Sequence, residues 1–241
     1  MDESKIEEMF DKEDDYWWFV ARREMVLDLL KKFVKRDAPL LDAGCGTGLL
    51  TKTVDRKYKV TAIDFSKKSL ALTRKRKPKA KILWANLEKT LPFPKNSFSG
   101  ITLLDVLEHV DDIKSLPNLV RVMKPGGVMI ITVPAYPWLF SYWDVLHQHK
   151  RRYTRTQLVQ LLEKYGLIVE HSSYFNTVFF PLILLVRLCK SSFRGQRDSD
   201  CYEMPKKANN LLHVIFRKET WLATKFRIPF GLSLLIVARK K

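Results

Sequence analysis

The order of apolar and polar positions along the chain predicts strands that alternate with helices. Short apolar runs predict strands at 39–42, 59–63, 81–84, 100–104, 128–133, 167–174 and 232–237. Helical spacing or a capping residue predicts helices at 16–35, 47–56, 66–76, 111 or 112 to 123, and 154–166. This alternation is typical of an α/β fold with a parallel sheet, in which ligands bind beyond the carboxyl ends of the strands.

A glycine-rich turn follows the first predicted strand. Residues 40–48 read LLDAGCGTG, and glycines there allow positive φ angles and let a ligand lie against bare backbone. The second strand ends at Asp64, where a carboxylate can accept both hydroxyls of a ribose. Together these features predict a nucleoside-containing cofactor, although an ordinary tight turn would explain the glycines alone.

The acidic residue before the turn further narrows the class of ligand that the turn can bind. The glycines follow the pattern GxGxG, whereas dinucleotide-binding turns read GxGxxG and face a pyrophosphate. Asp42 precedes the glycines, and its charge would repel a phosphate but would suit a cationic amino-acid group.

The segment 40–48 resembles motif I of the class I S-adenosylmethionine (SAM) dependent methyltransferases. The resemblance continues in the same order along the chain. Segment 86–93 resembles the part that flanks the adenine, and segment 97–110 resembles the fourth strand with its active-site end. Segment 122–127 is similar to the KPGG turn before the fifth strand. It covers about residues 38–175. Asn86 departs from the Asp of many relatives, but its carbonyl oxygen can still accept a hydrogen bond from the adenine amino group.

This resemblance implies a Rossmann-like α/β fold with a seven-stranded, mostly parallel sheet flanked by helices, and SAM as the cofactor. It implies an N-terminal helical cap at 1–37 and a methyltransferase domain at 38–241. Substrate-covering insertions are expected at about 134–153 and 176–228, the second as a helical segment near the C-terminus that covers the active site.

The resemblance also implies how the cofactor is held. Its amino-acid end would lie against Asp42 and the glycine-rich turn, its ribose against Asp64, its adenine near 86–87 and its methionine near Asp105. The aromatic segment 16–19 would either cover the cofactor or pack on the sheet edge. The predicted cofactor residues are Arg22, Asp42, Gly44, Cys45, Gly46, Asp64, Phe65, Asn86, Leu87 and Asp105.

Three residues are candidates for catalysis. The pattern Asp144, His149 and 151–153 resembles an Asp…HxRRY signature in a bacterial and archaeal subgroup of these enzymes. His149 is the first candidate for a general base, because a neutral imidazole can take a proton as the methyl group arrives, and a structural histidine is the alternative. His109 is the second candidate, with packing near the cofactor as its alternative, and Tyr153 would donate a hydrogen bond or wall the pocket.

The same aromatic and basic segment supplies the predicted substrate contacts. Arg151 and Arg152 have fork-shaped donors that could clamp a carboxylate or phosphate, or they could pair with Asp144 or be solvated. The predicted substrate-binding residues are Trp138, Asp144, Arg151 and Arg152.

The net charge is +17 and is unevenly placed, because residues 1–15 hold eight of the 26 acidic residues. Such a basic surface would attract nucleic acid, an acidic lipid face or a phosphorylated substrate, although runs of charge are often only solvated. The apolar segment 175–189 is broken by Pro181 and Arg187 and falls short of the roughly 20 apolar residues of a membrane span. With its basic flanks it suits an acidic membrane surface or a lipid-like substrate, or a buried helix with an exposed loop at 191–205.

The cysteines indicate a reducing compartment. Cys45, Cys189 and Cys201 have neither metal-binding spacing nor a disulfide framework, so we predict no metal centre. The acidic, polar start of the chain lacks the pattern of a secretory signal. We therefore expect a cytoplasmic protein, with possible peripheral contact at the inner membrane face.

The sequence after the fourth strand bears on the acceptor. It reads DVLEHV, without the NPPY or DPPY of amino-directed DNA methyltransferases, and favours an oxygen or carbon of a small-molecule or lipid-like acceptor. The basic surface would suit an anionic acceptor. An RNA methyltransferase using the basic surface is an alternative, but no RNA-binding module or paired catalytic cysteines are recognisable. A non-catalytic SAM-binding protein is the other alternative, and the oligomeric state is not predicted.

Overall fold

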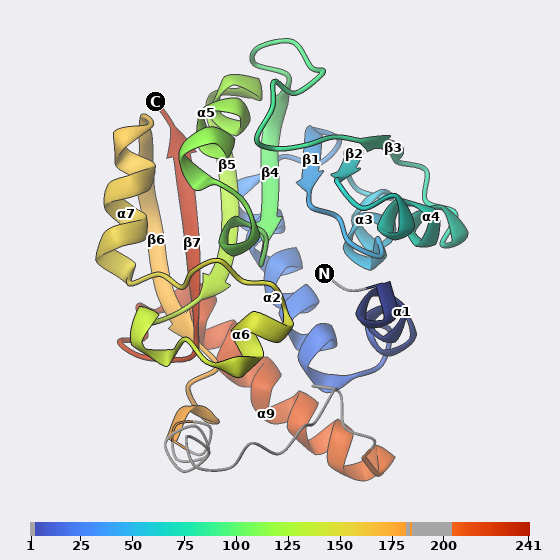
Figure 1. Ribbon diagram of the computed structural model, residues 1–241, viewed down its shortest axis with the longest axis vertical. Coiled ribbons are helices and arrows are strands. Elements are labelled where there is room, and N and C mark those ends of the chain that lie inside the picture. Colours follow the sequence, from blue (N-terminus) through green and yellow to red (C-terminus); the bar gives the residue numbers. More distant parts are fainter. Residues whose placement is uncertain (1–2, 182–183, 185–203) are drawn as a thin grey trace.

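The computed structural model describes residues 3–181, 184 and 204–241, and its centre is a seven-stranded sheet with the order β3-β2-β1-β4-β5-β7-β6 (Figure 1). Strand β7 runs antiparallel to both of its neighbours, and the other pairs are parallel. The mostly parallel sheet predicted from the sequence is thereby confirmed. The strands are β1 (Pro39–Ala43), β2 (Lys59–Asp64), β3 (Lys81–Trp84), β4 (Phe98–Leu104), β5 (Met123–Pro134), β6 (Leu167–Phe175) and β7 (Ser233–Lys240).

Helices cover both faces of the sheet. Buried side chains of α5 and α7 pack on one face, and those of α2 and α9 pack on the other. The described helices are α1 (Glu3–Lys12), α2 (Trp17–Phe33), α3 (Leu49–Val54), α4 (Lys67–Lys75), α5 (Asp112–Val122), α6 (Tyr142–Leu146), α7 (Arg155–Lys164) and α9 (Lys206–Lys225), with short 3₁₀ turns at Leu107–His109 and Pro137–Leu139.

Two hydrophobic cores result, one on each face. Successive side chains of a strand point to opposite faces, so Leu41 joins the core under α5 and α7 while its neighbour Leu40 joins the core under α2 and α9. In β5, the side chain of Met129 joins the first of these cores and that of Ile130 joins the second. Strands buried on both faces read as continuous apolar runs, which is why the sequence located them.

Side-chain caps fix three helix starts that the sequence predicted. The hydroxyl of Ser66 accepts a hydrogen bond from the Ser69 amide, and Asp111 accepts from two amides of the first turn of α5. Thr154 and Gln157 form a reciprocal capping box at the start of α7.

Some boundaries differ from the prediction. The helix expected at 47–56 is only Leu49–Val54, because the glycine-rich turn continues to Gly48, whose φ is 83°. Strand β5 begins at Met123, which pairs with Phe98 before an irregularity shifts the register to Gly100↔Val128. Helix α1 was not predicted as a separate element.

Helix α9 belongs to the segment that was expected to cover the active site. It packs against α2 and β6: Phe216 lies edge-on to Trp17, with ring centroids 5.1 Å apart, and the His171 ring is 2.7 Å from the Ala223 carbonyl oxygen. Among the described helices, none is long and apolar enough to cross a membrane. Residues 182–183 and 185–203, with Cys189, Cys201 and most of the loop expected at 191–205, lie outside the described residues.

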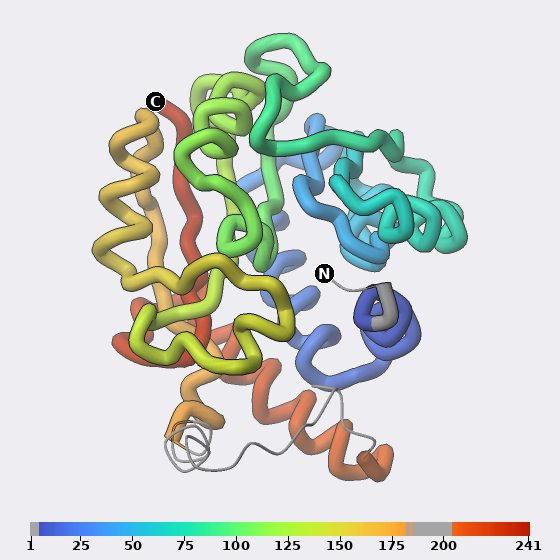
Figure 2. The backbone as a smooth tube through the Cα atoms, in the orientation of Figure 1, coloured from blue at the N-terminus to red at the C-terminus, as the bar shows by residue number. Residues whose placement is uncertain are grey.

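The connection from β5 to α7, residues 135–154, lies at the end of the sheet to which the arrows of β4 and β5 point (Figures 1 and 2). Main-chain bonds hold it there, since Tyr153 bridges to Ala135 and the Lys150 amide donates to the Glu108 carbonyl at 2.8 Å. The segment expected to cover the substrate therefore reaches the carboxyl ends of the strands.

Candidate functional site

The glycine-rich turn folds tightly over the ends of β1 and β2. The amides of Gly44 and Cys45 both donate to the Ile63 carbonyl oxygen, at 2.8 and 3.0 Å. Gly44 has φ 76°, and a Cβ there would lie 2.4 Å from a methyl carbon of Val106. A larger residue at position 44 would collide with Val106, in the loop that follows β4. The close packing of the turn against this loop therefore requires glycine.

Asp64 connects this turn to the start of α4. Its Oδ2 accepts a hydrogen bond from the Gly46 amide at 2.9 Å, and its Oδ1 accepts from the Ser66 amide at 2.8 Å. Burial raises the pKa of Asp64, although these amide bonds oppose the effect. Each carboxylate oxygen can accept a further hydrogen bond, which leaves capacity for two ribose hydroxyls.

Asp42 lies beneath the turn. Its oxygens accept hydrogen bonds from the hydroxyls of Thr51 and Thr102, at 2.6 and 2.7 Å. Burial raises the pKa of Asp42. The expectation of a carboxylate facing a ligand therefore needs correction, because this buried side chain anchors β1 to α3 and β4.

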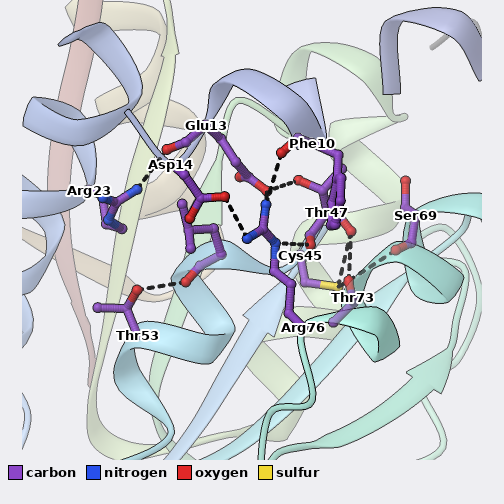
Figure 3. Close-up of polar contacts among 12 residues, drawn as sticks. Phe10, Glu13, Asp14, Arg23, Cys45, Thr47, Thr53, Ser69, Thr73 and Arg76 are labelled. Atoms are coloured by element: carbon purple, nitrogen blue, oxygen red, sulfur yellow. Dashed lines mark hydrogen bonds and ion pairs between the residues drawn. The ribbon is translucent and has the colours of Figure 1, made fainter. Parts of the chain in front are cut away.

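Arg76, which follows α4, fastens the N-terminal helix to the turn (Figure 3). Its guanidinium donates to the Thr47 carbonyl oxygen at 3.1 Å and pairs with Glu13 and Asp14 at 2.8 and 2.9 Å. The Met9 methyl group lies 3.2 Å from the position of a Cβ on Gly46. Met9, Glu13 and Arg76 were not predicted as site residues, because contacts between distant segments of the chain leave no local signal in the sequence.

Cys45 points away from the turn's surface. Its Sγ lies 3.8 Å from the Thr73 hydroxyl, which itself donates to the Gly46 carbonyl (Figure 3). Burial, together with Asp42 and Asp64, raises the pKa of the thiol well above its usual value. Cys45 therefore remains a thiol at neutral pH and is not poised as a nucleophile.

A cavity of about 280 Å³ lies beside the residues predicted for adenine, lined by Trp84, Ala85, Asn86, Lys89, Thr90 and Pro92. Asn86 accepts a hydrogen bond from the Glu88 amide at 2.8 Å, and Leu87 is buried. Phe65 is 65% exposed and lies against Trp84. A larger depression of about 530 Å³ is lined by Pro39, Lys59, Lys81 and neighbours, at the opposite end of the sheet from this site.

Arg22 and Asp105 form an ion pair at 2.7 Å between α2 and the end of β4. Asp105 has φ 52°, an uncommon conformation for a residue other than glycine, and its Oδ1 accepts from the Thr132 hydroxyl at 3.1 Å. The Arg22 guanidinium also stacks over the Trp18 ring, 4.9 Å from its centroid. Both predicted residues lie at the carboxyl edge, paired with each other.

Two predicted catalytic histidines come together beside Glu108. The rings of His109 and His149 are 4.9 Å apart, and one potential ligand atom on each of the three residues lies within 4.8 Å of the others. Nδ1 of His149 faces Asp144 Oδ1 at 2.9 Å, and Nδ1 of His109 faces the Gln148 carbonyl at 3.2 Å. Burial and the neighbouring His149 lower the pKa of His109 to about 4.

Asp144 is the buried centre of the segment predicted to bind substrate. It accepts hydrogen bonds from Arg152 Nε at 2.6 Å and from the Ser141 amide at 2.8 Å, in addition to His149. Burial acts to raise the pKa of Asp144, but the bonds from His149 and Arg152 outweigh it and hold the pKa well below its usual range. Asp144 therefore orients His149 and does not face a substrate.

Neither arginine of the HxRRY segment is placed as a substrate clamp. Arg152 is buried and forms an ion pair with Asp144, and Arg151 Nη1 pairs with Asp112 Oδ1 at 2.8 Å. The alternative of pairing with acidic residues therefore describes both side chains, although Arg151 uses Asp112. Trp138, in contrast, is 62% exposed and remains available for contact.

Tyr153 also has a structural place. Its hydroxyl donates to Asp112 Oδ2 at 2.8 Å, and its ring belongs to the core under α5 and α7. Burial and the Asp112 bond raise the pKa of Tyr153 well above its usual value. The expectation of a catalytic tyrosine is corrected by this burial, because the phenol hydroxyl is bonded to Asp112 within the core.

The chain is similar in sequence to known methyltransferases. Residues 41–131 match the family described as "Methyltransferase domain". The chain is 31% identical over 163 residues to a "Probable S-adenosylmethionine-dependent methyltransferase" of Mycolicibacterium smegmatis, over 66% of this chain and 62% of that protein. It is 29% identical over 177 residues to the 2-phytyl-1,4-naphtoquinone methyltransferase of Thermosynechococcus vestitus, over 69% of this chain and 76% of that one.

The fold is shared with solved structures. Phosphoethanolamine N-methyltransferase 2 of Haemonchus contortus, in complex with S-adenosyl-L-methionine, superposes with a TM-score of 0.59 at 21% identity. The match covers 89% of this chain and 51% of that one. The chain thus spans less than two thirds of the length of the Mycolicibacterium relative and about half of the Haemonchus protein.

Proposed function

Since this chain belongs to the class I SAM-dependent methyltransferases, we propose that it transfers the methyl group of SAM to an oxygen or carbon of a small, apolar acceptor such as a quinol or a lipid-like molecule. The observation that carries the proposal is the glycine-rich turn folded onto Asp64, with Gly46 and Ser66 bonded to that carboxylate. The turn and the carboxylate lie within the segment that matches the methyltransferase domain.

The residues at the carboxyl edge fit SAM. Asp64 retains acceptor capacity for a ribose, the bare backbone at 44–46 suits the amino-acid end, and the cavity beside Asn86 suits an adenine. SAM supplies a methyl group that is already activated on a sulfonium. The protein then has to hold the acceptor in line and manage one proton.

The ion pair of Arg22 with Asp105 would border the acceptor side of the cofactor. It is largely shielded from solvent, because the side chains are 16% and 28% exposed. The pair fixes α2 against the end of β4. An acceptor bound next to this ion pair would therefore be held by side chains that move little. Positioning of this kind is the main contribution a protein makes to a reaction whose methyl group is already activated.

His149 is our proposal for the proton acceptor. A carboxylate next to Nδ1 requires that nitrogen to carry the hydrogen, which leaves the lone pair on Nε2. His109 stays neutral near pH 7 because its pKa is lowered to about 4. His109 lies in the turn that follows β4, four residues after Asp105, and His149 reaches it from the connection after β5.

An apolar, ring-containing acceptor is supported by two observations. One relative is named as a naphtoquinone methyltransferase. In this chain, the connection after β5 presents Trp138, Phe140 and Tyr142 as exposed aromatic side chains. Exposed aromatic side chains at the mouth of a site favour flat apolar ligands.

We also propose a cytoplasmic protein that touches the inner membrane face. Helix α9 exposes Leu211, Val214 and Trp221. Lys206 and Lys207 begin the same helix, and the whole chain carries a net charge of +17. Apolar side chains with basic neighbours bind acidic lipid surfaces, where a lipid-like acceptor would be met.

The test is a labelled-methyl transfer assay with the purified chain. [Methyl-³H]SAM is added to cell extract, which is then separated into lipid, RNA and small-molecule fractions. We expect label in the lipid or small-molecule fraction, followed by transfer to a purified quinol. Label in RNA would replace the proposal by an RNA methyltransferase, and SAM binding by calorimetry without transfer to any fraction would indicate a non-catalytic SAM-binding protein.

A further inference from the structure

We infer that Glu108, His109 and His149 form a binding site for a divalent transition-metal ion of the Zn²⁺ type, separate from the glycine-rich turn. This replaces our expectation from the sequence that the chain has no metal centre. The inference concerns binding of the ion and does not require that methyl transfer be shown.

The three side chains come from two segments that the backbone holds together. Glu108 and His109 lie in the 3₁₀ turn after β4, and His149 lies after α6. The Lys150 amide donates to the Glu108 carbonyl oxygen at 2.8 Å, which fixes one segment against the other. One potential ligand atom from each residue lies within 4.8 Å of the others. Ligand atoms that share a tetrahedral zinc ion lie roughly 3.3 Å apart. Side-chain rotations that move each ligand atom by about 1 Å would therefore bring the three atoms to zinc-binding distances.

Glu108 is the observation that points to a cation. Its side chain is 0% exposed, and neither carboxylate oxygen has a hydrogen-bond partner among the described residues. A buried carboxylate without a partner costs several kcal/mol, and a protonated carboxyl would still lack an acceptor for its hydrogen. A bound cation would supply the partner that this carboxylate lacks.

The histidines are already held as metal ligands usually are. In metal sites, an imidazole commonly donates its other N–H to a carboxylate or a backbone carbonyl, which fixes the ring and its tautomer. His149 does this with Asp144 at 2.9 Å, and His109 does it with the Gln148 carbonyl at 3.2 Å. Asp144 is itself held by Arg152 and Ser141, so its carboxylate cannot swing away.

The ligand set selects the kind of ion. Two imidazoles and one carboxylate suit Zn²⁺ and similar borderline-soft ions, whereas Mg²⁺ and Ca²⁺ prefer oxygen alone. Three protein ligands leave one position open. An ion there would occupy the imidazole lone pairs, so His149 would act as a ligand in the metal-loaded protein and as a proton acceptor only in the metal-free one.

The test measures metal binding directly. The full chain is stripped with a chelator, checked for metal content, and titrated with ZnCl₂ by calorimetry and with CoCl₂ by visible absorption. We expect a single saturable site, a rise in Tm with Zn²⁺ and the absorption bands of Co²⁺ bound to nitrogen and oxygen ligands. Glu108→Gln preserves shape and should weaken binding of both ions about 10-fold or more, while its metal-free form stays folded by circular dichroism.

Two further variants separate a site from a general effect. Asp144→Asn should weaken Zn²⁺ binding by about 10- to 100-fold, because the carboxylate orients His149 without touching the ion. His213→Gln removes an imidazole on α9 that bonds to Glu24, and it should leave Zn²⁺ affinity unchanged. SAM affinity, measured on the same samples, should persist in Glu108→Gln. Absence of Zn²⁺ and Co²⁺ binding by the stripped chain, or equal affinity in Glu108→Gln, would overturn the inference whatever the result with SAM.

Discussion

Arg76 and Glu13 form an ion pair, with 2.8 Å between Nη2 and Oε1, that joins the N-terminal helix to the glycine-rich turn. The two side chains are only 9% and 12% exposed. The same guanidinium donates to the carbonyl oxygens of Phe10 and Thr47, so one side chain links α1, the turn and α4. Helix α1 therefore lies over the edge at which we propose that the cofactor binds.

Arg76→Ala should release α1. The substitution leaves the Glu13 carboxylate shielded from water without its cation, and removing one partner of a buried pair costs about 3 kcal/mol. Chemical denaturation should show that loss, and amide hydrogen exchange should rise across residues 5–16. Arg74→Ala, at an exposed position of α4, is the matched control and should change neither measurement. Unchanged exchange in Arg76→Ala would show that α1 is held by its apolar side chains alone.

Asp64→Ala should weaken SAM binding by about 2 kcal/mol, or roughly 30-fold, because charged hydrogen bonds to the ribose are lost. Calorimetry measures the change. Asp55→Ala removes a carboxylate that also accepts a backbone amide, from Lys79 at 2.6 Å, but at the other end of the sheet. That control should bind SAM as the parent does, and equal affinity in both variants would remove Asp64 from the site.

His149→Ala should preserve SAM affinity and slow methyl transfer by about 10²-fold, the usual contribution of a general base. Single-turnover kinetics with saturating SAM separates the two effects. The matched control is His213→Gln, which should leave the rate unchanged. A normal rate in His149→Ala would assign that residue a purely structural or metal-binding role.

Trp138→Ala should raise the KM for the acceptor about 10-fold, which corresponds to loss of roughly 1.4 kcal/mol of apolar contact, with SAM affinity unchanged. Trp221→Ala on α9 removes a comparably exposed indole away from the connection after β5. It should leave KM unchanged for a soluble acceptor and should weaken binding to vesicles that contain acidic lipid. A shift in KM from Trp221 alone would move the acceptor site to α9.

Stability should fall as the pH is lowered below 6.5, because burial lowers the pKa of both His171 and His109. Burial lowers the pKa of His171 from its usual 6.5, so the folded chain resists a proton that the unfolded chain takes up. More protons bind the unfolded state in that range, and the free energy of unfolding therefore decreases with falling pH. Urea denaturation from pH 7.5 to 5 measures this slope. His171→Gln should make the slope shallower without abolishing it, because His109, whose pKa is lowered to about 4, acts in the same direction.

Local patterns in the sequence predicted most of the sheet because its strands are buried on both faces. Such strands appear as apolar runs, and the caps at Ser66, Asp111 and Thr154 are signals within a few residues of one another. The glycine-rich turn was visible for the same reason, since a position such as Gly44, with positive φ and Val106 packed against it, tolerates only glycine.

The sequence did not decide between the possible partners of its charged side chains. The HxRRY segment left a clamp for an anion and pairing with Asp144 as alternatives, and only the structure shows that Arg152 pairs with Asp144 while Tyr153 bonds to Asp112 in the core. A side chain's role depends on which groups face it, and sequence neighbours say little about that. Burial of Tyr153 in the core was likewise decided by the tertiary structure.

The sequence by itself therefore determined the order of strands and helices, the glycine-rich turn and the acid that ends β2, because each depends on contacts over a few residues. Only the tertiary structure decided that Arg76 fastens α1 over the turn and that Glu108 lies buried beside His109 and His149. These arrangements bring together side chains from distant segments in an environment poor in water, where each unpaired charge must find a partner or a proton.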